Sequence, residues 1–241
     1  MRSVCIRFLP SEGLILPFAH SAILQGVLYR LLSFDPSLSE EIHNKQSKFS
    51  RAYKFFCFSD ISGPYKIRYK TLNYSDTFEW EIRSADDKII DTIQRSVLTK
   101  PFFEINHTEC HVDSVETACK TFMNNEYIFN AKTPIIVSDT LENGYMLYYN
   151  PFQPEFTKKL TDNLVRKYQA FYGQLPVSEI SITVLDPDDK NKCVTRYKDT
   201  IINAWYGNYL IKADKDVIDF IYYTGLGRRN AAGFGTVSEK K

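Results

Sequence analysis

The chain has 241 residues, 44% of them hydrophobic and 15% aromatic, which predicts a folded protein long enough for two domains of ~120 residues each and excludes a long disordered tail. No apolar run approaches the ~18 residues of a membrane span, the N-terminus lacks the apolar core of a signal peptide, and the five scattered cysteines fit reduced thiols, so we expect a cytoplasmic protein with no membrane partner. A net charge of only +1 excludes attraction of nucleic acid by the overall field, so nucleic-acid binding requires a local basic patch.

The first half of the chain predicts the order β-α-β-β-α-β. Ser84, three residues before Asp87, resembles a capping box for the second helix of this half. The predicted elements are a strand at Val4–Leu9, a helix at Ser21–Leu32, a polar segment at Phe34–Ser50, strands at Tyr53–Phe58, Tyr65–Leu72 and Phe78–Ile82, a helix after Ser84, and a strand region at Phe102–Val112.

The second half begins near Met123 and repeats this order. Its clearest helix starts near Pro154 and ends at Gly173, as expected from proline at a helix start and glycine at a helix end. The other predicted elements are β-rich sequence at Thr133–Val137 and Tyr145–Tyr149, strands at Glu179–Leu185, Cys193–Tyr197 and Ile201–Tyr209, a helix at Asp214–Tyr222, and a last strand at Thr236–Ser238.

Each half therefore predicts a ferredoxin-like βαββαβ unit with an antiparallel sheet. The fold class is α+β, with two such units in tandem, an N-terminal domain at 1–122 and a C-terminal domain at 123–241. The same unit underlies the RRM, whose open sheet face binds single-stranded RNA.

Glycine is scarce except near the end of the chain, where four of the ten glycines fall within eleven positions: Gly225, Gly227, Gly233 and Gly235. Such a run lets the backbone adopt positive φ and approach a ligand closely. Arg228 and Arg229 lie inside it, so we expect an anionic ligand, and a phosphate backbone fits best. A dinucleotide fingerprint is the alternative, but it requires a helix and a second strand after the glycines, for which the remaining residues leave no room.

His43 is the candidate general base. It lies in a polar segment after the first predicted helix, and four cations follow it, at Lys45, Lys48, Arg51 and Lys54. Metal-free RNA cleavage needs such a set, because the imidazole accepts the proton of a ribose 2′-OH and an ammonium stabilises the phosphorane. Tyr29, on the first predicted helix, carries a phenol that can protonate the leaving 5′-oxygen. The alternatives stay open at this point: a solvated histidine in a charged loop, and a tyrosine at the edge of the core.

Two further groups of residues have competing interpretations. His107, Cys110, His111 and Cys119 lack the paired short spacings of structural zinc sites, and an exposed polar strand edge explains them as well, so we expect no metal site. His20, just before the first predicted helix, is interpreted as a helix-entry or capping residue rather than a base.

One predicted strand presents a basic face, because Lys66, Arg68 and Lys70 alternate with apolar and aromatic residues. This face either contacts RNA phosphates or is neutralised by Glu79 and Glu81 on the adjacent predicted strand. The sequence does not decide between these two interpretations.

The pattern Gly225-Leu226-Gly227-x5-Gly233-Phe234-Gly235 on a duplicated ferredoxin-like chain resembles the CRISPR repeat-processing endoribonucleases, the Cas6 family of the RAMP superfamily. The block Leu24-Gln25-Gly26-Val27-Leu28-Tyr29, followed by His43, resembles members of the same family. The resemblance covers the whole chain.

The resemblance implies a nuclease that cuts precursor CRISPR RNA within each repeat, without metal or other cofactor, and leaves a 2′,3′-cyclic phosphate and a 5′-OH. It assigns catalysis to Tyr29, His43 and a lysine, which we place at Lys48. Lys45 and Arg51 are alternatives for that lysine and are further expected RNA contacts.

The resemblance also places the glycine segment, with Arg228 and Arg229, near the scissile region. The nearly neutral chain points to help from a homodimer partner or a CRISPR effector complex. The alternative function is that of a non-catalytic RNA-binding RAMP subunit.

Overall fold

The computed structural model describes residues 1–44 and 53–240 and separates into two compact units. Unit 1 comprises Met1–Cys119 with Ala231–Gly233, and unit 2 comprises Lys120–Asn230 with Phe234–Lys241. The middle of the glycine-rich segment is therefore part of unit 1, whereas its two ends are part of unit 2. The prediction of two independently folding domains at 1–122 and 123–241 is not tested by this division and stays a prediction.

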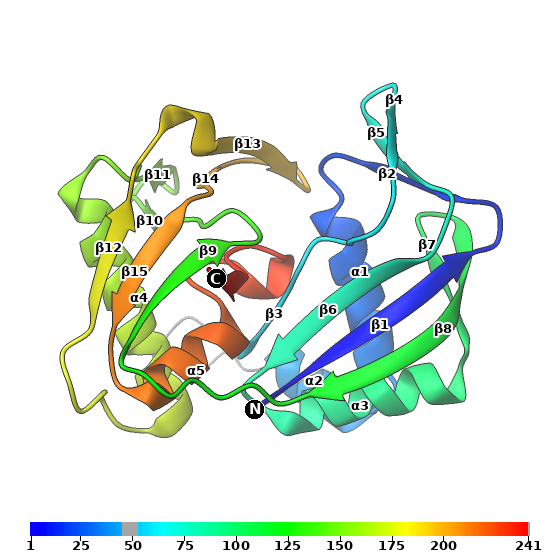
Figure 1. The fold of residues 1–241 in the computed structure, drawn as a ribbon, viewed down its shortest axis with the longest axis horizontal. Coiled ribbons are helices and arrows are strands. Elements are labelled where there is room, and N and C mark those ends of the chain that lie inside the picture. The colour runs from blue at the N-terminus through cyan, green and yellow to red at the C-terminus, as the bar shows by residue number, and fades with distance from the viewer. Residues whose placement is uncertain (45–52, 241) are drawn as a thin grey trace. The chain divides into compact units, whose positions relative to one another are not determined.

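Unit 1 is built on an antiparallel sheet with the strand order β3-β6-β1-β8-β7 (Figure 1). The order β3-β6-β1-β8 is that of a ferredoxin-like unit, in which the first and third strands lie together at the centre. A second, three-stranded sheet has the order β2-β5-β4. The strands are β1 (Arg2–Pro10), β2 (Leu14–Pro17), β3 (Phe56–Phe58), β4 (Lys66–Arg68), β5 (Thr71–Tyr74), β6 (Phe78–Ser84), β7 (Phe102–Ile105) and β8 (Thr108–Ala118).

The described part of unit 1 has three helices: α1 (Ser21–Leu32), α2 (Pro36–Asn44) and α3 (Asp87–Thr99). The inward stripes of α1 and α3 are buried with the apolar residues of β1 and β6 in one core. Trp80 of β6 is fully buried there, and its indole N–H donates to the Ser59 carbonyl oxygen at 3.0 Å. Burial of this shared stripe is what holds the helices on the sheet.

Unit 2 has a sheet with the order β12-β15-β9-β16, again the ferredoxin-like order. Its strands are β9 (Glu126–Ala131), β10 (Ser138–Thr140), β11 (Met146–Tyr148), β12 (Ser181–Leu185), β13 (Lys192–Tyr197), β14 (Thr200–Trp205), β15 (Asn208–Lys212) and β16 (Val237–Glu239). Its helices are α4 (Pro154–Tyr172) and α5 (Lys215–Thr224), with short 3-10 turns η1 (Asp189–Asn191) and η2 (Asn230–Ala232). The predicted tandem ferredoxin-like fold is confirmed.

Part of the predicted polar segment is helical, because α2 occupies residues 36–44. Asp35 caps this helix by accepting hydrogen bonds from the backbone N–H groups of Ser37 and Leu38, both at 3.1 Å. Leu38 and Ile42, four residues apart, are buried and turn one face of the helix to the core. The prediction missed it because only two apolar residues mark the inward face.

Four other predicted elements were wrong in detail. The single strand predicted at Ile201–Tyr209 is two strands, β14 and β15, which belong to different sheets. The single strand predicted at Tyr65–Leu72 is a hairpin of β4 and β5, with its turn at Tyr69 and Lys70. The helix cap is Asp86, whose side chain accepts from the Lys88 N–H, and not Ser84, which lies in β6. The first strand of unit 2 is β9, whereas residues 133–137 form only isolated bridges.

None of the helices within residues 1–44 and 53–240 combines the length and apolar character needed to cross a bilayer.

Candidate functional site

Tyr29 and Lys54 form the central contact of the candidate site in unit 1. Tyr29 lies on α1, at the edge of the buried stripe, and its ring packs against the core. The Lys54 ammonium donates a hydrogen bond to the Tyr29 hydroxyl oxygen at 2.5 Å and lies 4.8 Å from the centre of its ring. Because the phenol oxygen is the acceptor in this bond, the bond does not use the phenol proton. The pair therefore joins a proton donor to a fixed positive charge.

Sequence reasoning did not select Lys54, although it is the last cation of the run that starts at Lys45. The run does not show which ammonium reaches the phenol. Strand β3 determines that Lys54 is the one, because its pairing with β6 fixes the backbone from Phe56, two residues after Lys54. Close to this point the Phe56 N–H donates to the Lys54 carbonyl oxygen at 2.8 Å.

The other predicted catalytic groups are only partly described. The backbone of His43 lies in the last turn of α2, and its side chain is outside the described part of the structure. Lys45, Lys48 and Arg51 lie outside the described residues altogether. The chain leaves α2 at Asn44 and is described again from Tyr53, directly before Lys54.

A second contact joins the two sequence motifs that carried the resemblance. The Gln25 side-chain amide donates to the Ala231 carbonyl oxygen at 2.7 Å. Gln25 and Tyr29 are four residues apart on α1 and so share one face of that helix. Gly233 packs against Phe58 so closely that a Cβ would lie 2.6 Å from a ring carbon. The centre of the glycine-rich segment, residues 231–233, is therefore held in unit 1 by the helix that carries Tyr29.

The remainder of the glycine-rich segment forms a tight structure in unit 2. Gly225 ends α5 with φ of 76°, and the Leu226 N–H donates to the Gly235 carbonyl oxygen at 2.8 Å. A Cβ on Gly235, where φ is 74°, would lie 1.9 Å from the Leu226 oxygen. Only glycine fits such a close approach of two backbones.

Lys167 and Asn230 hold this structure together from inside, and sequence reasoning missed both. The ammonium of Lys167, a residue with only 2% of its surface exposed, donates to the carbonyl oxygens of Thr224 and Gly225 and to Oδ1 of Asn230, at 3.2, 2.5 and 3.1 Å. The Asn230 amide in turn donates to the carbonyl oxygens of Leu226 and Phe234, at 2.9 and 3.0 Å. The position of Lys167 beside Tyr168, on the apolar stripe of α4, was the feature of the sequence that could have indicated a buried lysine.

The two arginines of the segment differ in their surroundings. Arg228 donates from Nη1 to the carbonyl oxygen and the hydroxyl of Ser138, at 2.7 and 3.1 Å. Its positive charge also contributes to the lowered pKa of Asp139, after the stronger hydrogen bond from Lys159. Arg228 therefore has an acidic neighbour within unit 2. Arg229 has a positive φ of 60°, and its guanidinium lies 5.5 Å from the centre of the Tyr197 ring.

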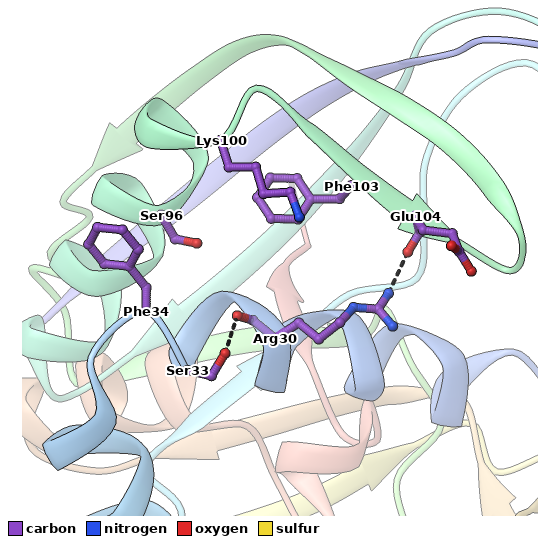
Figure 2. A pocket seen from close by; sticks show the side chains of 7 residues that line it. All are labelled: Arg30, Ser33, Phe34, Ser96, Lys100, Phe103 and Glu104. Atoms are coloured by element: carbon purple, nitrogen blue, oxygen red, sulfur yellow. Dashed lines mark hydrogen bonds between the residues drawn. The ribbon is translucent and has the colours of Figure 1, made fainter.

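A pocket of about 490 Å³ opens beside the C-terminal end of α1. Figure 2 shows the Arg30 guanidinium donating to the Glu104 carbonyl oxygen and the Ser33 hydroxyl donating to the Arg30 carbonyl oxygen. The described lining residues include no imidazole, thiol or phenol. They are Arg30, Ser33, Phe34, Ser96, Lys100, Phe103 and Glu104.

Comparison with known families gives one match, to the model described as "CRISPR associated protein Cas6, C-terminal", over residues 116–239. This range is more than half of the chain and includes the whole glycine-rich segment. The chain belongs to the Cas6 family. The family predicted from the glycine pattern and the Leu24–Tyr29 block is confirmed.

Full-length relatives extend the similarity to the N-terminal half. The chain is 24% identical over 237 residues to the CRISPR-associated endoribonuclease Cas6 of Pyrococcus furiosus, covering 96% of this chain and 88% of that one. It is 28% identical over 237 residues to the CRISPR-associated endoribonuclease Cas6 2 of Methanocaldococcus jannaschii, covering 90% and 91%.

Solved structures support the fold. A structure titled "An RAMP protein binding different RNA substrates" has a TM-score of 0.84 at 21% identity and covers 100% of both chains. One titled "CRISPR associated protein Cas6" has a TM-score of 0.82 at 23% identity and covers 100% of this chain and 99% of the other. The match to the Cas6 family model begins at residue 116, after the N-terminal candidate site, so it does not include Tyr29, His43 or Lys54.

The structure locates two of the histidines that have competing interpretations. His20 is a buried helix-entry residue at the start of α1, with Nδ1 3.0 Å from the Pro17 carbonyl oxygen and Nε2 3.5 Å from the Asp60 carboxylate. Burial disfavours protonation of His20, but the nearby Asp60 carboxylate and the backbone at Pro17 and Phe18 together outweigh burial, so the pKa of His20 is raised. His111 pairs with Glu109 at 3.1 Å on an exposed face of β8, which is not an edge strand because it pairs with both β1 and β7. Within residues 1–44 and 53–240, no three His, Cys, Asp or Glu side chains come together as a metal site.

Proposed function

We propose that this chain cuts precursor CRISPR RNA within its repeats, through attack of a ribose 2′-OH on the adjacent phosphate. Membership of the Cas6 family assigns it to the CRISPR-associated endoribonucleases. The observation that carries the mechanism is the hydrogen bond from the Lys54 ammonium to the Tyr29 hydroxyl, on the face of α1 that also holds residue 231 of the glycine-rich segment.

The reaction needs one proton acceptor, one proton donor and a positive charge. His43 accepts the proton of the 2′-OH as the O2′–P bond forms. The P–O5′ bond breaks, and Tyr29 gives its proton to the departing 5′-oxygen. The products are a 2′,3′-cyclic phosphate and a 5′-OH, and no atom is supplied by water or metal.

A cation is required because negative charge accumulates on the phosphorane. Lys48 is the residue assigned from the resemblance, and Lys54 is the cation that the described part of the structure places at the phenol. We propose that Lys54 fixes the orientation of the Tyr29 hydroxyl, whereas Lys48 stabilises the charge on the phosphate. Lys45 and Arg51, with Arg228 and Arg229, are proposed RNA contacts.

The decisive experiment is incubation of the purified protein with a labelled repeat RNA in EDTA, beside the same RNA with a single 2′-deoxy nucleotide at the cut. Cleavage at one site in the all-ribose RNA, abolished by the deoxy substitution, supports 2′-OH attack without metal. Tight binding without cleavage of either RNA would instead favour a non-catalytic RNA-binding RAMP subunit, working in an effector complex or as a homodimer. Restoration of cleavage by divalent metal alone would contradict the mechanism.

A further inference from the structure

The β4–β5 hairpin of unit 1 carries a row of exposed basic and aromatic side chains. Strand β4 is an edge strand of its three-stranded sheet, and it pairs only with β5 among the described residues. The turn between the two strands consists of Tyr69 and Lys70. All residues from 65 to 70 are exposed, in an alternation of Tyr65, Lys66, Ile67, Arg68, Tyr69 and Lys70.

The acidic residues suspected of neutralising this strand are used elsewhere. Glu79 accepts from Arg7 at 2.5 Å, and Glu81 accepts from Arg83 at 2.7 and 2.8 Å. Strand β4 does not lie beside them, because β6 pairs with β1 and β3 instead. Within the described part of the chain, no carboxylate forms an ion pair with the cations of the hairpin, which are Lys66, Arg68 and Lys70.

The turn itself holds bulky side chains in an unfavourable conformation. Tyr69 and Lys70 have φ of 47° and 62°, the left-handed values of a two-residue type I′ turn, for which Asn-Gly is the preferred sequence. Tyr69 is 100% exposed, so no packing against residues 1–44 or 53–240 compensates for the cost. Strained backbone conformations of this kind cluster at functional sites.

The two faces of the hairpin differ. Tyr65 and Ile67 lie on the face of Tyr74 and Leu72, and the rings of Tyr65 and Tyr74 are 5.5 Å apart, which connects the hairpin to the core. Lys66 and Arg68 lie on the other face and are two residues apart along one strand, ~6.6 Å. Successive phosphates of an extended nucleic-acid strand can therefore each meet one cation.

We propose that this hairpin is a second RNA contact, which binds a single-stranded segment of the repeat RNA or its flank. A base stacks on the Tyr69 ring, and the phosphates on either side of it contact Lys66, Arg68 and Lys70. The partner is a polyanion because the patch has three positive charges without a carboxylate partner among the described residues. It is single-stranded because an unpaired base exposes a face to the ring. Cations on an edge strand also disfavour addition of a further protein strand. This inference rests on the proposed function.

The first test separates the ring from the fold. The double variant Tyr69→Asn/Lys70→Gly installs the preferred turn sequence, so its melting temperature is expected to equal or exceed that of the wild type. Its affinity for a repeat RNA made uncleavable by one 2′-deoxy nucleotide is expected to fall roughly 5- to 100-fold, through loss of stacking and one phosphate contact. A stable variant with wild-type affinity would overturn the proposal.

The second test concerns the charges. Lys66→Gln/Arg68→Gln is expected to lower the slope of log K against log salt by about 1.4, or ~0.7 for each phosphate contact on a single strand. A matched control, Lys88→Gln/Lys158→Gln, removes two exposed cations from α3 and α4 and is expected to keep the wild-type slope. Equal slopes for the hairpin variant and the wild type would refute the contact.

The outcomes also separate this inference from the proposed function. Wild-type protein that cleaves repeat RNA, with hairpin variants that bind it unchanged, refutes the hairpin contact and leaves the nuclease standing. Wild-type protein that neither binds nor cleaves repeat RNA refutes both.

Discussion

Replacing Lys54 by methionine removes the ammonium at the Tyr29 hydroxyl and keeps most of the apolar side chain. A hydrogen bond with one charged partner contributes ~1.5–3 kcal/mol. If that energy orients the phenol in the transition state, its loss lowers the single-turnover rate of repeat RNA cleavage about 10- to 150-fold. Both side chains are partly accessible to solvent, so the lower end of this range is expected.

A double-mutant cycle tests whether Lys54 acts through the phenol. Tyr29→Phe removes the proton donor, and adding Lys54→Met to it is expected to cost little more, because both variants remove the same step. Lys88→Met, an exposed lysine on α3, is the control and is expected to cleave at the wild-type rate. A folded Lys54→Met variant with the wild-type rate, or a fully multiplicative loss in the double variant, would refute this assignment.

Three further predictions follow from the same contacts. His43→Ala is expected to reduce cleavage by about 10²–10⁴ while repeat RNA still binds, and cleavage at the wild-type rate would exclude it as the base. Lys167→Met leaves three buried oxygens without their donor and is expected to destabilise the protein by roughly 3 kcal/mol in denaturant unfolding, whereas an unchanged midpoint would show that the oxygens find other donors. The raised pKa of His20 stabilises the fold at low pH, below the unfolded value of 6.5, and this contribution is lost as the pH rises through the folded pKa. Asp60→Asn should therefore lower the melting temperature at about pH 5.5 and have less effect at about pH 8.5, and an equal effect at both pH values would contradict the pairing.

Periodic apolar residues were enough to predict most of the fold. The stripe on α1 gave its bounds at Ser21–Leu32, and Pro154 with Gly173 marked α4. These predictions succeeded because helix burial and end chemistry are local properties of the sequence. The hairpin turn at Tyr69 and Lys70 was missed because its sequence lacks the glycine or asparagine that normally signals such a turn.

The functional motifs divide in the same way. The four glycines could be recognised from the sequence because the close approach of two backbones admits no larger residue. The block ending at Tyr29 could be recognised because helical spacing places Gln25 and Tyr29 on one face of α1. The sequence does not show which of several lysines contacts a phenol, which enters the core and which stays exposed on a hairpin. Lys54, Lys167 and Lys66 are chemically identical along the chain, and only strand pairing and helix packing bring one to Tyr29, bury one beneath Gly225 and leave one facing solvent.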